Sequence, residues 1–375
     1  MQKLLALSLV ILLAAAETSH AKYRNGGRGG RGGRGAKAIF IFGDSLVDSG
    51  NNNYLNSLAK ANFAPNGEDW PNHLGTGRFC NGRLVADYIS EYMGTEPVLP
   101  ILDPKNTGRN LLRGANFASA GSGILDDTGA MFVQRLRVSE QYNLFRRYKG
   151  QLATFVGGRA ADRIVAAGLY SFTIGGNDYI NNYLQALSAR ARQYTPPQYN
   201  TLLVSTFKQQ LKASSTRDLY NMGARKISVG NMGPIGCIPS QITQRGVNGQ
   251  CVQNLNEYAR DYNSKLKPML DELNRELRGA LFVYVNAYDI LSDLVSNPGK
   301  NGFTVSNSAC CGQGNYNGLF ICTAFSTICN DRTKYVFWDP YHPTEKANIL
   351  IAQQTLFGGT NVISPMNLRQ LLALP

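Results

Sequence analysis

Short apolar runs alternate with helix-like segments from residue 37 to the C-terminus, and this alternation limits the folds open to the chain. The runs that predict strands are Ile39–Phe42, 110–119, 169–178, 225–232 and 280–288. The segments that predict helices are 81–94, 134–149, 198–222, 252–277 and 343–357, the last with Pro343 at its first position. This order predicts an α/β fold in which helices cover both faces of a central parallel sheet.

The first 36 residues differ in composition from the rest. Lys3 precedes an apolar run, Leu4–Ala16, and small residues lead to a cleavage site after Ala21, so residues 1–21 are predicted to be a signal peptide rather than a buried helix. Residues 22–36 are dominated by Gly and Arg and are predicted to be a disordered linker. Residues 37–375 contain no internal repeat or linker and are expected to form one domain, with no transmembrane segment.

The chain is basic, with a formal net charge of +13, of which Lys22 and the four arginines of residues 22–36 supply five charges. Positive charge favours an acidic surface, such as a cell-wall polysaccharide or a membrane. Arg-Gly repeats can also bind nucleic acid by charge. Because the predicted signal peptide directs the chain out of the cell, we expect an extracellular or cell-wall location and no nucleic-acid partner.

Seven cysteines suit a secreted chain held by disulfides. Cys237 and Cys251 bracket a loop rich in Pro, Gly and Asn and are natural partners. Four more lie within residues 297–333, a stretch without periodicity that we expect to be a disulfide-tied loop, and they should pair among themselves in an order left open: Cys310, Cys311, Cys322 and Cys329. Cys80 remains unpaired. The cysteines lack the usual zinc-ligand spacing, so no metal or other cofactor is expected.

The stretch "IFIFGDSLVDSGNNN", residues 39–53, places Ser45 directly after the first predicted strand. Gly, Asp, Ser and Asn are also common in ordinary turns, so the stretch alone leaves that interpretation open. In open α/β sheets, however, ligands bind beyond the carboxyl ends of the strands. Ser45 is therefore a candidate nucleophile.

Few histidines could act as the base for Ser45. Of the three, His20 lies in the signal peptide, which leaves His73 and His342. Asp339 precedes His342 by three residues, and a nucleophilic serine needs both a base and a carboxylate to orient it. Asp339 could instead only cap the helix near Pro343. No strand leads into the loop of His73, which fits a structural or substrate-lining role better.

Two glycine-rich loops after predicted strands could supply the donors that stabilise an oxyanion. They are "NFASAGSG", residues 116–123, and "GGND", residues 175–178. Glycine backbone amides and the Asn177 side chain are suitable donors. Loops that follow parallel strands share one edge of the sheet, so we expect both loops to lie near Ser45 and His342.

The blocks "FGDSLVDSGNNN", "NFASAGSGIL", "TIGGNDY" and "FWDPYHPTEKAN" closely resemble the plant GDSL esterase/lipase family of the SGNH hydrolases. The segments "GTGRFCNGR", "VGNMGPIGCIPS" and "ACCGQG" are also similar, and the resemblance covers roughly residues 37–360. It implies a three-layer α/β/α, flavodoxin-like fold and ester hydrolysis without a cofactor. It also implies Ser45 as nucleophile, His342 as base, Asp339 as third triad member, and an oxyanion hole made by Ser45, Gly121 (or, as an alternative, Gly123) and Asn177.

The sequence therefore predicts a secreted serine esterase or lipase that works through an acyl-enzyme. The ester could belong to a lipid, a cutin-like oligomer or an acetylated polysaccharide. One alternative is an acyltransferase that uses the same site. Another is a wall-associated binding protein with little turnover, against which the complete set of catalytic residues argues.

Overall fold

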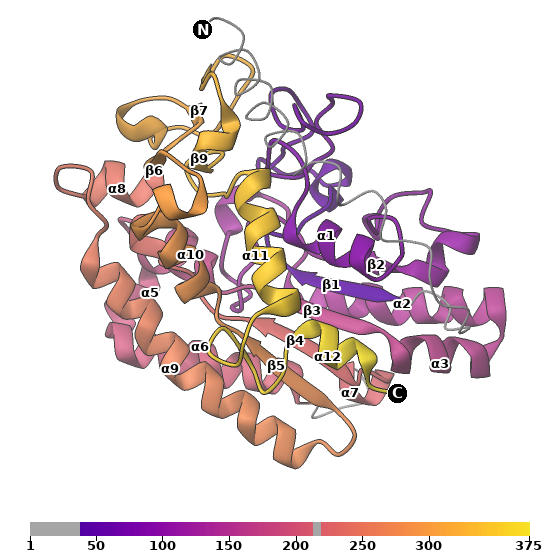
Figure 1. Cartoon of the computed structure of the whole chain (residues 1–375). Helices are drawn as coiled ribbons and strands as arrows, with labels where there is room; N and C mark the ends of the chain where they lie inside the picture. Colours follow the sequence, from indigo (N-terminus) through magenta and orange to yellow (C-terminus); the bar gives the residue numbers. More distant parts are fainter. Residues whose placement is uncertain (1–37, 213–218) are drawn as a thin grey trace, which may run out of the picture. The chain divides into compact units, whose positions relative to one another are not determined.

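The computed structural model describes residues 38–212 and 219–375, so the predicted signal peptide, 1–21, and linker, 22–36, lie outside the described residues. Within this part, strands form a sheet in the order β10-β5-β4-β3-β1-β2 (Figure 1). The strands are β1 (Ile39–Gly43), β2 (Gly114–Asn116), β3 (Leu169–Thr173), β4 (Lys226–Gly230), β5 (Leu281–Val285) and β10 (Ile363–Ser364). The first five pair in parallel and β10 pairs antiparallel with β5, which confirms the predicted parallel sheet and adds a short antiparallel edge.

Helices cover both faces of the sheet. Successive strand residues point to opposite sides, and the strands are apolar on both sides, so each face packs against a layer of helices. Phe40 and Phe42 of β1 face one layer, and Ile39 and Ile41 face the other. The first layer contains α2 (Val138–Val156), α3 (Gly158–Ala167), α6 (Pro196–Leu211) and α9 (Gln253–Glu276). The second contains α1 (Val85–Tyr92), α10 (Ala287–Ser296), α11 (Glu345–Phe357) and α12 (Leu368–Ala373). The predicted three-layer α/β/α architecture is confirmed.

Packing around β1 holds the end of this strand in place, and Ser45 follows two residues after it. The ring of Phe42 stacks between Phe117 and Phe172, with centroid distances of 4.9 and 5.0 Å. Gln141 of α2 accepts from the Gly43 amide at 3.0 Å and donates to the Gly43 carbonyl at 2.9 Å. A side chain at Gly43 would place its Cβ 2.1 Å from the Thr173 carbonyl oxygen, so only glycine fits here.

Several predicted helix bounds are wrong. The helix predicted over 134–149 is α2, which begins at Val138 and continues to Val156. The helix predicted over 198–222 is divided, since α6 ends at Leu211 and α7 spans Leu219–Met222. Pro343 is not the first residue of the helix predicted over 343–357, because Thr344 is its N-cap and this helix, α11, begins at Glu345.

Short elements connect the layers on the side where the strands end. They are α4 (Gly176–Asp178), a π-helical turn (Tyr179–Tyr183), α5 (Ala189–Gln193) and α8 (Pro239–Arg245). The Cys-rich stretch contains β6 (Val305–Ala309), β7 (Cys311–Gly312) and β8 (Thr327–Ile328), and β9 (Tyr335–Phe337) follows it. In Figure 1, β7 and β9 lie at the top of the molecule, above α11.

The cysteines pair within the two predicted groups. Cys237 bonds to Cys251, Cys310 to Cys329, and Cys311 to Cys322, which resolves the order that the sequence left open. Cys80 is a buried free thiol, as predicted, and burial raises its pKa.

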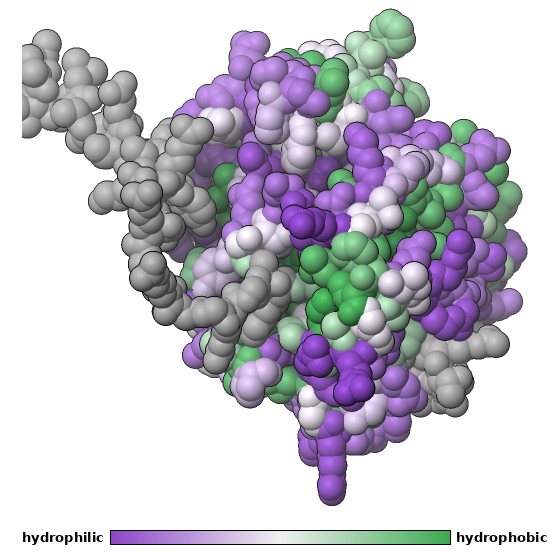
Figure 2. Space-filling view, turned by 90° about the vertical axis from the view of Figure 1, so that its right-hand side faces the viewer, coloured by the Kyte–Doolittle hydropathy of each residue, from purple (hydrophilic) through white to green (hydrophobic). Residues whose placement is uncertain are grey.

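The face shown in Figure 2 is mostly hydrophilic, with hydrophobic residues gathered in smaller groups between the hydrophilic ones. None of the helices within residues 38–212 and 219–375 is long and apolar enough to cross a bilayer.

Candidate active site

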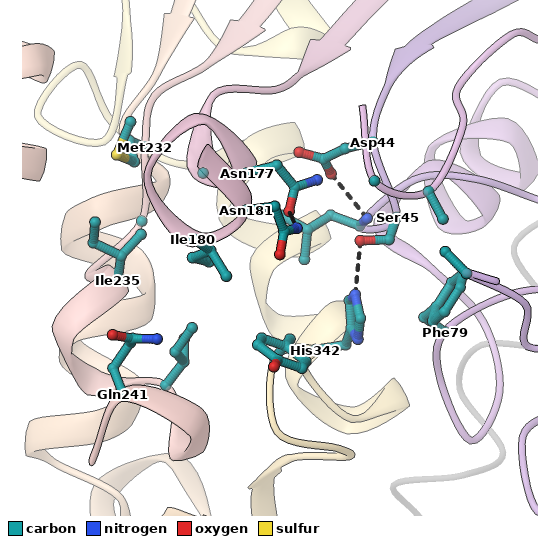
Figure 3. Close-up of a pocket in the computed structure, with 18 of the residues that line it drawn as sticks. Asp44, Ser45, Phe79, Asn177, Ile180, Asn181, Met232, Ile235, Gln241 and His342 are labelled. Carbon is teal, nitrogen blue, oxygen red and sulfur yellow. Dashed lines mark hydrogen bonds between the residues drawn. The ribbon is translucent and has the colours of Figure 1, made fainter. Parts of the chain in front are cut away.

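The structure brings Ser45, His342 and Asp339 together at the carboxyl ends of the strands. His342 Nε2 lies 2.7 Å from Ser45 Oγ (Figure 3), and His342 Nδ1 lies 2.8 Å from both carboxylate oxygens of Asp339. Asp339 and His342 are buried, whereas Ser45 is partly exposed. This geometry lets the imidazole take a proton from Ser45 while the carboxylate holds the opposite ring nitrogen.

A tight turn holds Asp339 and His342 in this arrangement. Asp339 Oδ1 accepts from the backbone amides of Tyr341 and His342 at 2.8 and 2.9 Å. The His342 carbonyl accepts from the Trp338 amide at 2.8 Å. The ring of Phe79 packs against the imidazole at a centroid distance of 5.0 Å. Asp339 therefore does not act as the cap of α11, a function that Thr344 fulfils.

His73 is not brought to Ser45. It is exposed, its Nδ1 contacts the Glu68 carbonyl, and it does not line the pocket around Ser45. The alternative base considered from the sequence therefore lies outside the pocket of the candidate nucleophile.

The amides of Ser45 and Gly121 and the side chain of Asn177 line the same pocket. Within the described part of the chain, neither the Ser45 nor the Gly121 backbone N–H donates to a protein acceptor. Gly121 has a φ of +85°, and a Cβ there would approach the Phe132 ring to 2.5 Å, which explains the glycine. Gly123 does not line the pocket, so Gly121 fits the donor position better than the alternative, Gly123.

Two hydrogen bonds orient the Asn177 amide. Its Nδ2 donates to the Ser122 carbonyl at 2.9 Å, and its Oδ1 accepts from Asn181 Nδ2 at 2.7 Å. The second hydrogen of Asn177 Nδ2 has no acceptor among the described residues and is available to a ligand. Asn181 lies in the π-helical turn, a distortion that often occurs at functional sites.

The pocket has a volume of about 400 Å³ and extends away from Ser45 along apolar side chains. In Figure 3, Ser45, His342 and Phe79 lie on one side, and Met232, Ile235 and Gln241 lie on the other. A cavity of this size, lined mainly by apolar side chains with polar groups among them, suits a small or elongated organic ligand. Among residues 38–212 and 219–375, no cluster of three or more His, Cys, Asp or Glu side chains forms a potential metal site.

Comparison with known proteins identifies the family. The family model for GDSL-like lipase/acylhydrolase matches residues 39–355. A GDSL esterase/lipase of Arabidopsis thaliana is 46% identical over 340 residues, which cover 90% of this chain and 91% of that protein. GDSL esterase/lipase LTL1 of the same plant is 45% identical, with coverages of 90% and 92%. GDSL esterase/lipase 7, also from Arabidopsis thaliana, is 44% identical, with coverages of 98% and 100%.

The chain belongs to the GDSL lipase/acylhydrolase family. It is accordingly a carboxylic ester hydrolase of the serine type, as the sequence predicted. The resemblance noted from the four sequence blocks is confirmed over nearly the whole predicted domain.

Sequence reasoning missed the polar residues that hold the loops of this GDSL hydrolase. Asp48 accepts from the amides of Gly50, Asn51 and Ala120 at 2.7 to 3.0 Å. Asn51 Nδ2 donates to the carbonyls of Asn116 and Ala118, which lie in the loop that leads to Gly121. The run of three asparagines after Ser45 was the available signal, but nothing in the sequence named the partners of these side chains.

Two buried carboxyl groups near Ser45 differ in their number of donors. Asp44 accepts one backbone bond, from the Leu46 amide at 3.0 Å, and burial raises its pKa to about 7. Asp178 accepts from the amides of Ile124 and Leu125 and from the Thr128 hydroxyl, and burial raises its pKa to about 6. Asp178 thus links the loop after Gly121 to the element that contains Asn177.

Proposed function

We propose that the chain hydrolyses carboxylic esters through an acyl-enzyme formed on Ser45. The observation that carries this proposal is the continuous chain of contacts from Asp339 through His342 to Ser45, at the wall of an apolar pocket. His342 Nε2 takes the Ser45 proton as Oγ attacks the ester carbonyl. The Ser45 and Gly121 amides and the Asn177 side chain donate to the oxyanion that forms.

The remaining steps follow from the position of His342. The imidazolium gives its proton to the leaving alcohol oxygen as the ester C–O bond breaks, which leaves the acyl group on Ser45. His342 then takes a proton from water as the water oxygen attacks the acyl carbonyl. It gives that proton to Ser45 Oγ as the bond between Oγ and the acyl carbon breaks and the carboxylic acid leaves. Asp339 stays ionised throughout and stabilises the imidazolium.

Hydrolysis of p-nitrophenyl esters by the wild type and by Ser45→Ala tests this proposal. Removing a triad member typically costs about 10⁴-fold or more in kcat. His342→Ala should show a loss of the same order, and His73→Ala is the matched histidine control that should keep full activity. Equal activity of the wild type and Ser45→Ala would sink the proposal. Added alcohol that captures the acyl group in place of water would favour the acyltransferase alternative.

We also propose that the protein acts outside the cell. Three disulfides within the described residues support an oxidising compartment. We further propose that the basic linker, 22–36, attaches the enzyme to an acidic cell-wall surface. When the full chain is expressed in plant cells, it should appear in the medium or the wall with Lys22 as its N-terminal residue. A chain that stays inside the cell with residues 1–21 still attached would contradict this.

A further inference from the structure

One face of α8 presents polar side chains to the pocket, away from Ser45. Gln241, Gln244 and Arg245 all line the pocket, and their spacing of three and four residues places them on one side of this helix. In Figure 3, Gln241 lies across the pocket from Ser45 and His342, and its amide nitrogen is turned toward their side. The pocket therefore has a second polar region besides the candidate triad and oxyanion donors.

The side-chain amide of Gln241 is buried but has no protein partner. The residue is 3% exposed, and neither its Oε1 nor its Nε2 forms a hydrogen bond with any of residues 38–212 and 219–375. An unpaired buried polar group costs free energy, so such a group in the wall of a pocket indicates a ligand that pairs with it. Because the nitrogen is the end turned toward the pocket, the ligand group must accept a hydrogen bond.

Arg245 brings a positive charge to the same region. Its guanidinium donates to Gln244 Oε1 and to the Leu184 carbonyl, both at 3.0 Å, and these bonds hold the exposed side chain at the pocket. Arg245 forms no ion pair within the described part of the chain, and its other N–H groups are free to donate to a ligand. Among the described residues that line the pocket, only Asp44 has a carboxyl group, and it is buried beside Ser45.

Two other amide side chains that line the pocket already donate to protein acceptors. Asn181 donates to Asn177, and Gln185 Nε2 donates to the Ile180 carbonyl at 2.6 Å. The side chain of Ile180 lies between Gln241 and Asn177 in Figure 3. A ligand that connects the oxyanion donors with α8 therefore passes an apolar side chain and ends at free donors.

We propose that α8 recognises a carboxylate of the substrate, remote from the ester that Ser45 attacks, with Arg245 and the Gln241 amide as donors. The proposal rests on the esterase function proposed above and names the substrate as an ester that carries an ionised carboxyl group. A carboxylate has one negative charge and accepts from a guanidinium and an amide together, which matches the single cation here. A phosphate monoester carries about −1.5 to −2 charges at pH 7, of which Arg245 would leave part unpaired beside apolar side chains.

The experiment compares esters that differ in charge alone. Mono-p-nitrophenyl suberate carries a carboxylate on the acyl chain, and ω-acetoxyoctanoate carries one on the alcohol part. In the neutral partner of each, a primary amide replaces the carboxylate. The ratio of kcat/KM for the charged ester to kcat/KM for the neutral ester is measured in the wild type, Arg245→Gln, Arg245→Lys and Gln241→Met. Arg192→Gln is the matched control for the loss of one positive charge, because Arg192 is exposed in α5 and does not line the pocket.

The wild type should prefer the charged member of one pair about tenfold, mainly through a lower KM, because a contact remote from the ester binds substrate and transition state alike. The pair that shows this preference identifies the part of the substrate that lies against α8. Arg245→Gln should abolish the preference, Arg245→Lys should keep part of it, and Gln241→Met should reduce it about threefold. Added salt should weaken it, because Arg245 is exposed.

A ratio near one for both pairs in the wild type overturns the proposal, as does an equal fall in Arg192→Gln. Calorimetric binding of the same esters to Ser45→Ala needs no turnover and separates recognition from chemistry. If the wild type hydrolyses none of these esters, the proposed chemistry fails. Tighter binding of the charged ester to Ser45→Ala than to Ser45→Ala/Arg245→Gln would still support recognition by α8, and equal binding would overturn it.

Discussion

The loop after β1 and the Cys-rich stretch both border the pocket, but different forces hold them. Residues 44–53 are mostly buried and are connected to the loop of residues 116–121 by hydrogen bonds: Asn51 and Asn52 donate to carbonyls of that loop, and Asp48 accepts from the Ala120 amide. Residues 310–329 have many exposed side chains and are joined by two disulfides. The first region presents the candidate nucleophile, and the second presents exposed apolar side chains, among them Phe320 and Ile321.

This difference follows from what each region must do. An oxyanion donor must be placed within a few tenths of an ångström, which buried hydrogen bonds with defined geometry achieve. A segment that exposes Phe320 and Phe325 to solvent does not bury those side chains in a core of its own. Its two disulfides therefore supply part of its stability. Buried hydrogen bonds thus position the loop that contains Ser45, whereas disulfides hold the exposed segment on the other border of the same pocket.

Among the changes considered, replacing Asp48 with alanine should cause the largest loss in the free energy of unfolding, because it removes hydrogen bonds that hold the first region. The change leaves three backbone amides without their acceptor, and each unsatisfied buried group costs about 1–3 kcal/mol, so we expect a loss of about 5 kcal/mol in the free energy of unfolding. Urea denaturation measures this loss. Asp331→Ala is the control, because that exposed carboxylate accepts from one backbone amide and should change stability by less than about 1 kcal/mol. A loss in Asp48→Ala no larger than in the control would show that the network does not hold the loop.

Asp44→Asn tests the first region through the pH dependence of its free energy of unfolding. Because burial raises the pKa of Asp44 from 3.8 to about 7, the native state keeps its proton over a range in which the unfolded state has lost it. The free energy of unfolding of the wild type should therefore fall as pH rises from about 4 to about 7, by ~1.4 kcal/mol per pH unit from this group. Asparagine does not titrate, but its Oδ1 can still accept from the Leu46 amide.

The stability of Asp44→Asn relative to the wild type should thus increase by up to about 4 kcal/mol between about pH 4 and pH 8. Urea denaturation of both proteins at the two pH values gives this difference, in which the effects of titrating groups that do not interact with Asp44 cancel. A difference that does not change with pH would mean that Asp44 is ionised in the native state across the whole range.

The site residues could be proposed from the sequence because few residues can do this chemistry. With His20 in the predicted signal peptide, only His73 and His342 remained as bases, and the strand ends indicated where Ser45 and Asn177 should lie. The parallel sheet followed from the alternation of strands and helices. These inferences use local pattern and residue type, which a sequence displays directly.

The supporting contacts could not be predicted, because they depend on packing between distant segments. Gln141 lies 98 positions from Gly43, and no local pattern links the two. The general preference for proline in the first turn predicts a helix start at Pro343, but the Thr344 side chain accepts from the Ala347 amide as the N-cap, so α11 begins two residues later, at Glu345. Disulfide pairing within the Cys-rich stretch likewise required the fold to bring Cys311 next to Cys322.

Removing the Cys311–Cys322 disulfide tests the second region and should have the smallest effect of the three changes. The link closes a loop with a sequence separation of 11 residues, for which the loss of chain entropy predicts about 2–3 kcal/mol of stabilisation. The double variant Cys311→Ala/Cys322→Ala should lose about that much in urea denaturation. Its activity on dissolved p-nitrophenyl acetate should remain, because none of the triad or oxyanion residues belongs to this loop. A collapse of that activity would mean that the Cys-rich stretch positions the catalytic residues as well, and the division of labour between the two regions would be wrong.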